Sequence, residues 1–310
     1  MTVYNKLIEL NTRDGVAPVI NNEIQDLITT LIGYGYYQSQ FAEMRNILVR
    51  ELVAYQTKNR IDTVVLGMSG GIDSALTAAL FKAADYRVIG MTLPIHQDPS
   101  ETARGVEACE ALGIEHIQKD LSEAFDFVST NLDDFDDSNS DRIRQGNIRA
   151  RLRMITLYNQ AAKHGGFVAS TDNFSELSAG FWTLHGDVGD VAPIQSLSKS
   201  WEVPNLAELL GVPQSIVTAK PTDGLGVANG DEDQFGFSYM EFDAVLFALI
   251  GNIKFSQELP DTQELVAKVK QRIASTSFKR FNPLNLMHPL DGSTRYDNLE
   301  AYDNNTQIGE

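Results

Sequence analysis

A glycine-rich turn with two serines and one aspartate is the part of this chain whose residue types could do chemistry. Residues 67–74 read GMSGGIDS and join a β-like segment, 62–68, to a helix-like segment, 75–84. At such a turn, backbone N–H groups and the positive end of the helix point to one spot, where a polyphosphate can be held. The hydroxyls of Ser69 and Ser74 can donate to phosphate oxygens, and the glycines allow the main chain to come close.

Asp73 is the residue of this turn that needs a separate explanation. A carboxylate beside a polyphosphate is repelled by it unless a cation lies between them, so Asp73 predicts a Mg²⁺ ion that bridges to the phosphates. The alternative is a strand-turn-helix joint in which the glycines only make a tight turn and Asp73 caps the helix. That alternative leaves the two serines unexplained.

The elements around the turn must bring it into contact with other functional groups. They alternate between strand-like segments (62–68, 87–93, 115–119 and 167–170) and helix-like segments (75–84, 99–112, 122–129 and 143–164). This alternation predicts an α/β fold with a doubly wound, mostly parallel sheet and flanking helices. Ligands bind at the carboxyl ends of such strands. We therefore expect three turns, 67–74, 92–94 and 170–172, to meet at one crevice.

The length of 310 residues and the hydrophobic content of 43% allow a full core. We expect a single domain over residues 1–287, with a helical part at 1–60, made of helices at about 22–34 and 38–59, that packs on the sheet or takes part in a dimer contact. Residues 288–310 read as a flexible acidic tail. Two further segments, 131–141 and 220–233, are rich in aspartate and glycine and read as loops of the kind that often act as lids.

The net charge of −17 argues against general affinity for nucleic acids or anionic membranes, because both need a positive surface. The chain has no uninterrupted apolar stretch of membrane-spanning length and no basic-then-apolar N-terminus, so we expect it to stay in the cytoplasm. Its one cysteine, Cys109, is expected to be a packed core thiol. An anionic ligand needs a local basic pocket, for which the candidates are Arg142, Arg144, Arg149, Arg151, Arg153, Lys199, Lys220, Lys279 and Arg280.

The turn at 69–74 resembles the SGGxDS signature of the N-type ATP pyrophosphatases, which split ATP into AMP and pyrophosphate. Further segments, in the same order and at similar spacings, resemble NAD synthetases, and the resemblance covers about residues 45–285. They are 146–151 (GNIRAR), 170–176 (STDNFSE), Gly186-Asp187 with Asp190 and Pro193, 198–199 (SK), 220–222 (KPT), 231–232 (DE) and 278–280 (FKR).

This resemblance implies a fold of the adenine nucleotide alpha hydrolase kind, which is Rossmann-like, and an ATP-dependent ligase. The implied reaction first transfers AMP from ATP to the nicotinate carboxylate of deamido-NAD and releases pyrophosphate. Ammonia then displaces AMP and gives NAD. The resemblance also implies a requirement for Mg²⁺ and a homodimer, since members of the family build the deamido-NAD site at a two-fold interface.

The resemblance further implies a role for each matching residue. ATP would be bound by Gly67, Met68, Ser69, Gly70, Gly71, Ile72, Asp73, Ser74, Thr171, Lys199 and Thr222. Asp73 and Glu176 would hold Mg²⁺, although taken alone Glu176 could be a surface or N-cap acid. Deamido-NAD would be bound by Arg151, Leu184, Asp190, Phe278 and Lys279. The groups implied in the chemistry are Asp73, Glu176, Lys199 and Asp187, the last of which would orient the nicotinate or ammonia.

The chain departs from the ammonia-fed members of the family at two of these positions. Leu184 stands where a lysine is usual, in a form that resembles the glutamine-fed branch, and Phe278 replaces a histidine. The amidase domain of that branch would not fit before residue 60, so we expect free ammonia or a separate ammonia-supplying protein. Two other readings stay open: another amidating or thiolating ATP pyrophosphatase, and a nucleotide-binding sensor without turnover.

Overall fold

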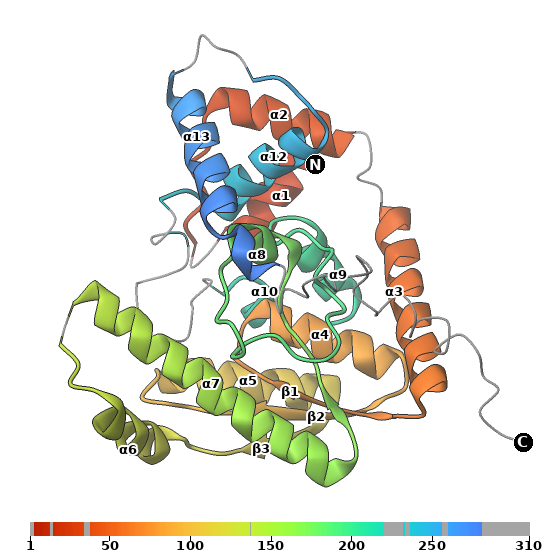
Figure 1. Ribbon diagram of the computed structural model, residues 1–310. Coiled ribbons are helices and arrows are strands. Elements are labelled where there is room, and N and C mark those ends of the chain that lie inside the picture. The colour runs from red at the N-terminus through yellow and green to blue at the C-terminus, as the bar shows by residue number, and fades with distance from the viewer. Residues whose placement is uncertain are drawn as a thin grey trace, which may run out of the picture.

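One parallel sheet with helices on both faces forms the frame of the molecule (Figure 1). The structure is a computed structural model that describes residues 3–12, 15–33, 38–136, 138–219, 232, 236–255 and 260–280. The four strands are ordered β3-β2-β1-β4 and comprise β1 (Thr63–Gly67), β2 (Arg87–Thr92), β3 (Glu115–Gln118) and β4 (Phe167–Val168). The expected α/β fold with a parallel sheet is confirmed. The tail at 288–310, Thr222 and almost all of the loop at 220–233 lie outside the described residues.

The register of the strands brings their carboxyl ends to one edge. β1 pairs in parallel with β2, with Gly67 opposite Met91, and on its other side with β4, with Val65 opposite Val168. Residues Thr63 to Leu66 are all buried, as expected for a central strand covered on both faces. The turn that follows Gly67 therefore lies in the middle of the sheet edge.

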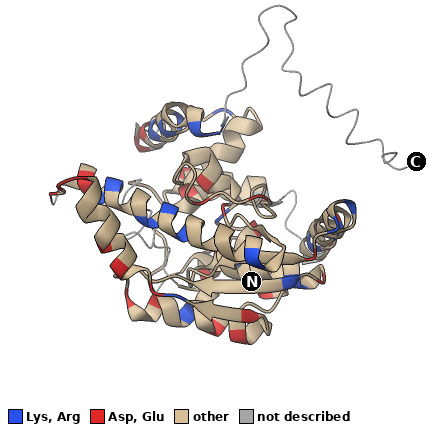
Figure 2. Ribbon diagram, turned by 60° about the horizontal axis from the view of Figure 1, so that its bottom comes forward, with Lys and Arg blue, Asp and Glu red and all other residues tan. Residues whose placement is uncertain are grey.

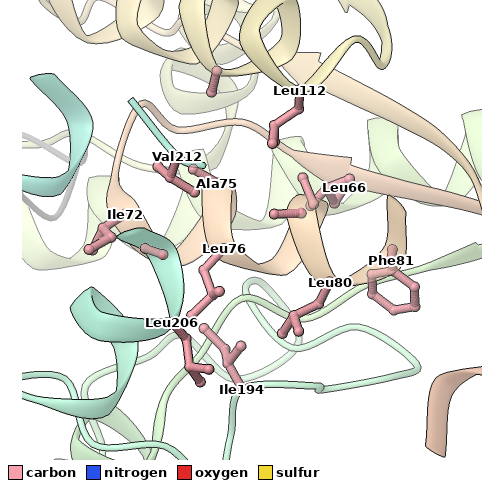
Figure 3. Packing of buried hydrophobic residues seen from close by; sticks show 14 of the residues in the cluster. Leu66, Ile72, Ala75, Leu76, Leu80, Phe81, Leu112, Ile194, Leu206 and Val212 are labelled. Carbon is pink, nitrogen blue, oxygen red and sulfur yellow. The ribbon is translucent and has the colours of Figure 1, made fainter. Parts of the chain in front are cut away.

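The side chains of β1 alternate between two apolar clusters. Val64 and Leu66 pack with α4 (Ile72–Ala83) and α9 (Glu202–Leu209), and Figure 3 shows Leu66 among Leu76, Leu80 and Leu206 in this cluster. Val65 packs with α6 (Ser122–Leu132) and α7 (Asn139–His164) on the opposite face. The same α4 cluster contains the buried thiol of Cys109, so the prediction of a core cysteine is confirmed.

A third apolar cluster lies away from the sheet and is built mainly from helices. It is formed by residues of α1 (Val3–Asn11), α2 (Asn22–Gly33), α8 (Phe174–Ala179), α12 (Tyr239–Ile250) and α13 (Pro260–Ser275). Figure 1 shows these helices gathered on one side of the sheet. The remaining helices are α3 (Gln38–Asn59), α5 (Pro99–Leu112), α10 (Gln214–Val217) and the short 3-10 helix η1 (Ser277–Lys279). Helix α8, which carries the candidate site residue Glu176, thus lies between the sheet and this helical cluster.

Within residues 1–60, α3 packs on the helices α4 and α9, and α2 packs on α12. Helix α1 is an addition to the prediction, and it joins two clusters because Leu7 packs in the helical cluster and Leu10 in the α4 cluster. Whether this part also makes a dimer contact, and whether residues 1–287 act as one domain, stay predictions.

The acidic loop expected at 131–141 is shorter than predicted. α6 continues to Leu132, and α7 begins at Asn139 because the hydroxyl of Ser138 accepts a hydrogen bond from the N–H of Asp141 at 3.2 Å. Arg144 forms ion pairs with Asp133 and with Asp141, so this arginine is used within the loop. No helix in the described part of the chain is both long and apolar enough to cross a membrane.

Candidate active site

The turn at 67–74 is built by hydrogen bonds among its own small residues. The N–H of Gly71 donates to the Ser69 hydroxyl at 3.2 Å, and the Ser74 hydroxyl donates to the Gly71 carbonyl at 3.0 Å. The two hydroxyl oxygens lie 3.2 Å apart. Gly71 is the N-cap of α4 and no side chain caps it, so the alternative in which Asp73 caps this helix is wrong. The N–H groups at the start of α4 stay available to an anion.

Gly70 allows α5 to pack against this turn. Its φ is +86°, and a Cβ placed on it would lie 2.3 Å from the carbonyl oxygen of Glu101 and 3.2 Å from Cβ of Arg104. Any other residue would therefore combine an unfavourable backbone conformation with a collision against main-chain atoms. The turn needs glycine here because a helix lies against it.

Asp73 and Glu176 face each other across the ammonium group of Lys199. The ammonium forms an ion pair with Oδ2 of Asp73 and a second one with Oε1 of Glu176 at 3.2 Å. All three side chains are largely buried, with 14%, 13% and 6% of Asp73, Glu176 and Lys199 exposed. The side-chain amide of Asn173 donates to Oδ1 of Asp73 at 3.0 Å. Two carboxylates and one cation from three separate segments thus meet beside the turn at 67–74.

Glu176 has two roles at the start of α8. Its Oε2 accepts the N–H of Asn173 at 3.3 Å, while the Asn173 side chain accepts the N–H of Glu176 at 3.0 Å, so the pair forms a capping box. Its other oxygen, Oε1, meets Lys199. The carboxylate of Glu176 therefore both takes part in the cap of α8 and faces the site, and the capping box fixes its direction.

A buried aspartate in α12 supports this arrangement from behind. Asp243 is fully buried and accepts hydrogen bonds from the Ser175 hydroxyl, from the Ser200 N–H at 2.9 Å and from the Ser200 hydroxyl at 2.6 Å. The Ser175 hydroxyl in turn accepts the N–H of Lys199 at 2.9 Å. Burial raises the pKa of Asp243 to about 6, although these hydrogen bonds act in the opposite direction. The sequence signal for Asp243, an acid within the apolar run YMEFDAVLFALI, was missed.

A cavity of about 470 Å³ opens between the turn, α7, α8 and the segment that follows α8. Leu93 and Thr171 lie in its wall beside the turn, which confirms that the three expected turns meet. The cavity brings together the following predicted site residues: Gly67, Met68, Ser69, Gly70, Gly71, Ile72, Asp73, Ser74, Thr171, Glu176, Asp187, Lys199 and Lys279.

The part of the cavity away from the turn holds two further carboxyl groups and a lysine. Burial raises the pKa of Asp187, although the N–H of Thr183 donates to it at 2.6 Å and the charge of Lys279 favours its ionised form. Asp172, which is 7% exposed, has its pKa raised well above the usual range by burial and by the charge of Asp187. Lys279 donates to the carbonyl oxygens of Gly180 at 2.8 Å and of Trp182 at 2.5 Å, and burial lowers its pKa. Acidic and basic groups with shifted pKa values thus share one wall.

Four residues predicted to bind deamido-NAD do not line this cavity: Arg151, Leu184, Asp190 and Phe278. Arg151 is exposed and donates to the Leu184 carbonyl at 3.3 Å. Asp190 accepts the N–H of Val168 at 2.9 Å and the hydroxyl of Tyr158 at 2.8 Å, which ties β4 to α7. Phe278 is 62% exposed.

Arg153, one of the candidates for a basic pocket, lies in the cavity wall, although the family resemblance implied no role for it. Its guanidinium donates to the Leu93 carbonyl at 3.1 Å and to Oε1 of Gln97 at 2.8 Å. The helical period indicates the inward position of Arg153, since residues three apart share one face of a helix and Ala150 of α7 is buried. Figure 2 shows the basic residues spread along α7, and the buried residues of that helix recur every three to four positions, as in Ala150, Met154 and Leu157.

Comparison with known proteins agrees with this geometry. Residues 44–283 match the family model described as NAD synthase. The NH(3)-dependent NAD(+) synthetase of Pyrococcus furiosus is 36% identical over 76% of this chain and 93% of its own length, and that of Finegoldia magna is 37% identical over 70% of this chain and 89% of its own.

Solved structures give the same result. The NMN synthetase of Francisella tularensis superposes with a TM-score of 0.68 at 28% identity and covers 77% of this chain and 95% of its own. The NH3-dependent NAD synthetase of Campylobacter jejuni has a TM-score of 0.64, 28% identity, and coverage of 77% and 96%. With the Ser-Gly-Gly turn, Asp73 and Glu176 facing one cavity, and with these matches, the chain belongs to the NAD synthase family.

Proposed function

We propose that this protein is an ATP-dependent ligase that amidates the nicotinate carboxylate of deamido-NAD with ammonia. A carboxylate oxygen attacks the α-phosphorus of ATP and pyrophosphate leaves. The nitrogen of ammonia then attacks the carbonyl carbon, AMP leaves, and a proton from the nitrogen passes to a base. The observation that carries this proposal is the convergence of the turn at 67–74, Asp73, Glu176 and Lys199 on one cavity.

The turn would hold the two phosphates that leave. Its main-chain N–H groups at the start of α4 and the hydroxyls of Ser69 and Ser74 offer donors within one small space. Thr171, which follows a separate strand, lines the same cavity and would contact the same nucleotide. Lys199 supplies a positive charge that can move from the carboxylates to a phosphate.

Asp73 and Glu176 would hold a Mg²⁺ ion. In the described part of the chain, no group of three or more His, Cys, Asp or Glu side chains could hold a metal by itself. A set of two carboxylates fits Mg²⁺, which is usually bound by one or two protein carboxylates together with phosphate oxygens and waters. When bound with ATP, the ion would neutralise charge on the phosphates. Asn173 keeps Asp73 in place, and the capping box keeps Glu176 in place.

The far wall of the cavity would receive the nicotinate carboxylate and ammonia. Asp187 has a raised pKa, so its carboxylate is a stronger base than that of an exposed aspartate and suits the removal of a proton from the attacking nitrogen. Lys279, fixed by the carbonyls of Gly180 and Trp182, would attract the acceptor's anionic groups. Free ammonia, or ammonia from a separate protein, is the proposed nitrogen source, and the cytoplasm the proposed location.

A homodimer would complete the acceptor site. Arg151 and Phe278 are exposed and lie outside the cavity of the single chain, where a second copy could bring them to a ligand. Ile143, Ile155 and Tyr158 of α7 are also exposed, with 46%, 67% and 41% of each accessible. An apolar strip of this kind on α7 suits contact with another copy. Sedimentation at micromolar protein concentration tests the association.

The reaction is tested with the purified chain, ATP, Mg²⁺, deamido-NAD and ammonium, following NAD and pyrophosphate together. Equal amounts of the two products support the proposal. Pyrophosphate without NAD indicates another ATP pyrophosphatase, and neither product indicates a nucleotide-binding protein without turnover. A parallel assay with nicotinate mononucleotide is warranted by the likeness to the Francisella NMN synthetase. Faster turnover of that acceptor would show that the smaller nucleotide is the preferred substrate.

A further inference from the structure

An arginine from α5 lies beside the phosphate turn, although it belongs to no part of the turn itself. The first turn of α5 packs against Gly70, where the carbonyl of Glu101 and Cβ of Arg104 lie within 2.3 and 3.2 Å of the position that a Cβ on Gly70 would take. The side chain of Arg104 therefore leaves α5 next to the main chain of the turn. It lines the cavity together with Ser69 and Asp73.

Arg104 also lines a second hollow, of about 660 Å³, that adjoins the first. Glu101 and Ala219 are the other residues found in the walls of both. Arg104 thus lies where the two spaces meet, beside the phosphate turn. A nucleotide whose phosphates sit on the turn would have its phosphate end within reach of this group.

The hydrogen-bonding state of Arg104 points to a ligand. Its Nε–H is buried and has no hydrogen-bond partner. Within the described residues Arg104 also takes part in no ion pair, although the carboxylate of Asp98 is near enough for the arginine to lower its pKa. A buried donor without a partner costs free energy. An acceptor on a bound ligand would remove this cost for the Nε–H of Arg104.

The other cations of the cavity are already used inside the protein. Lys199 is paired with Asp73 and Glu176, Arg153 donates to main-chain and side-chain oxygens, Arg272 donates to one carbonyl and Lys279 to two. Arg104 differs from all four, because its buried donor has no acceptor. The planar guanidinium can donate two parallel hydrogen bonds to phosphate oxygens.

We propose that Arg104 is a phosphate-binding residue that contacts the β- and γ-phosphates of ATP, the pair that leaves as pyrophosphate. The proposal rests on the proposed function, because it takes ATP as the ligand of the turn. Two donors from α5 would then act together with the main-chain N–H groups of the turn and with the hydroxyls of Ser69 and Ser74. Arg104 would hold the leaving group from the side of α5.

The test compares binding of pyrophosphate and of AMP by calorimetry, using the full chain with Mg²⁺ present throughout. Arg104→Ala is expected to weaken pyrophosphate binding by about tenfold to a hundredfold, as for the loss of hydrogen bonds to a charged group. AMP binding should stay within about twofold, because AMP lacks both phosphates that Arg104 contacts. Arg50→Ala in α3 is the matched control, since Arg50 is 68% exposed and forms an ion pair with its neighbour Glu51.

A second variant and the wild type separate the remaining outcomes. Arg104→Gln keeps most of the side-chain volume and should show the same selective loss if the alanine variant fails to fold. An unchanged pyrophosphate affinity in a folded Arg104 variant overturns the proposal, and so does an equal loss of pyrophosphate and AMP, which indicates a structural role. If the wild type binds neither ligand, the proposed function fails, and that result is distinct from a failure of Arg104 alone.

Discussion

Replacing Gly70 by alanine tests whether the packing of α5 fixes the phosphate turn. Two effects oppose the new methyl group. At a φ of +86° an alanine costs about 1–2 kcal/mol. In addition, the methyl carbon would lie 2.3 Å from the Glu101 carbonyl, and forcing α5 and the turn apart costs about 1–3 kcal/mol. The expected loss of unfolding free energy is therefore about 2–5 kcal/mol.

Gly211 provides a matched control for the backbone effect. Its φ is +77°, and a Cβ placed on it would meet nothing within 4 Å. Gly211→Ala should therefore lose about 1–2 kcal/mol of unfolding free energy, from its backbone conformation alone. The difference between the two variants isolates the collision with Glu101.

Urea unfolding of both variants and of the wild type measures these free energies, and calorimetry measures the affinity of each protein for ATP. Gly70→Ala should bind ATP at least about tenfold more weakly, equal to 1.4 kcal/mol, because its turn cannot keep its place beside α5. Gly211→Ala should bind ATP as the wild type does. Equal unfolding free energies for the two variants, together with wild-type ATP affinity in Gly70→Ala, would refute the reasoning.

Three further predictions concern the charged groups around the turn. The pKa of Asp243 is raised to about 6, so the folded state binds more protons than the unfolded state between roughly pH 4 and 6, and stability falls as the pH rises. Asp243→Asn should lack this decline, which amounts to about 1 kcal/mol between pH 5 and 7 in urea unfolding, and parallel curves would contradict it. Lys199→Ala leaves the carboxylates of Asp73 and Glu176 without the lysine between them. Without nucleotide, adding Mg²⁺ should therefore raise the melting temperature of this variant by a few degrees more than that of the wild type. An identical rise in both proteins would contradict the ion-pair argument. Glu176→Gln should slow pyrophosphate release from ATP and deamido-NAD by about a hundredfold or more, and a rate near that of the wild type would remove Glu176 from the proposed metal site.

Most of the sheet could be predicted because its signals are local. Apolar runs mark β1 and β2, and the range 99–112 is the helix α5 as observed, with Asp98 as its N-cap and Gly113 as its left-handed C-cap. The phosphate turn was found for the same reason, since its residues are adjacent in the sequence. The helix α1 was missed because nine residues with a mixed pattern give a weak signal.

The site beyond the turn could be predicted only in part. Lys199 lies 126 residues from Asp73 in the sequence, and nothing local shows that a lysine expected at phosphates pairs with two carboxylates. Arg151 and Arg153 lie about 200° apart around α7, so only one of them can face the cavity of a single chain, and the family resemblance that points to Arg151 does not show which. Asp190 is used by the backbone of β4 and by Tyr158, which depends on how α7 crosses the sheet.

The ammonium group between Asp73 and Glu176 also bears on the order in which ligands arrive. With Lys199 in place the trio carries a single negative charge, so a lone divalent ion gains little by entering. A triphosphate changes that balance, because it adds several negative charges, draws the lysine toward itself and uncovers both carboxylates. ATP and Mg²⁺ are therefore expected to bind together. In the ligand-free protein, Lys199 holds the two carboxylates in position without a bound Mg²⁺ ion.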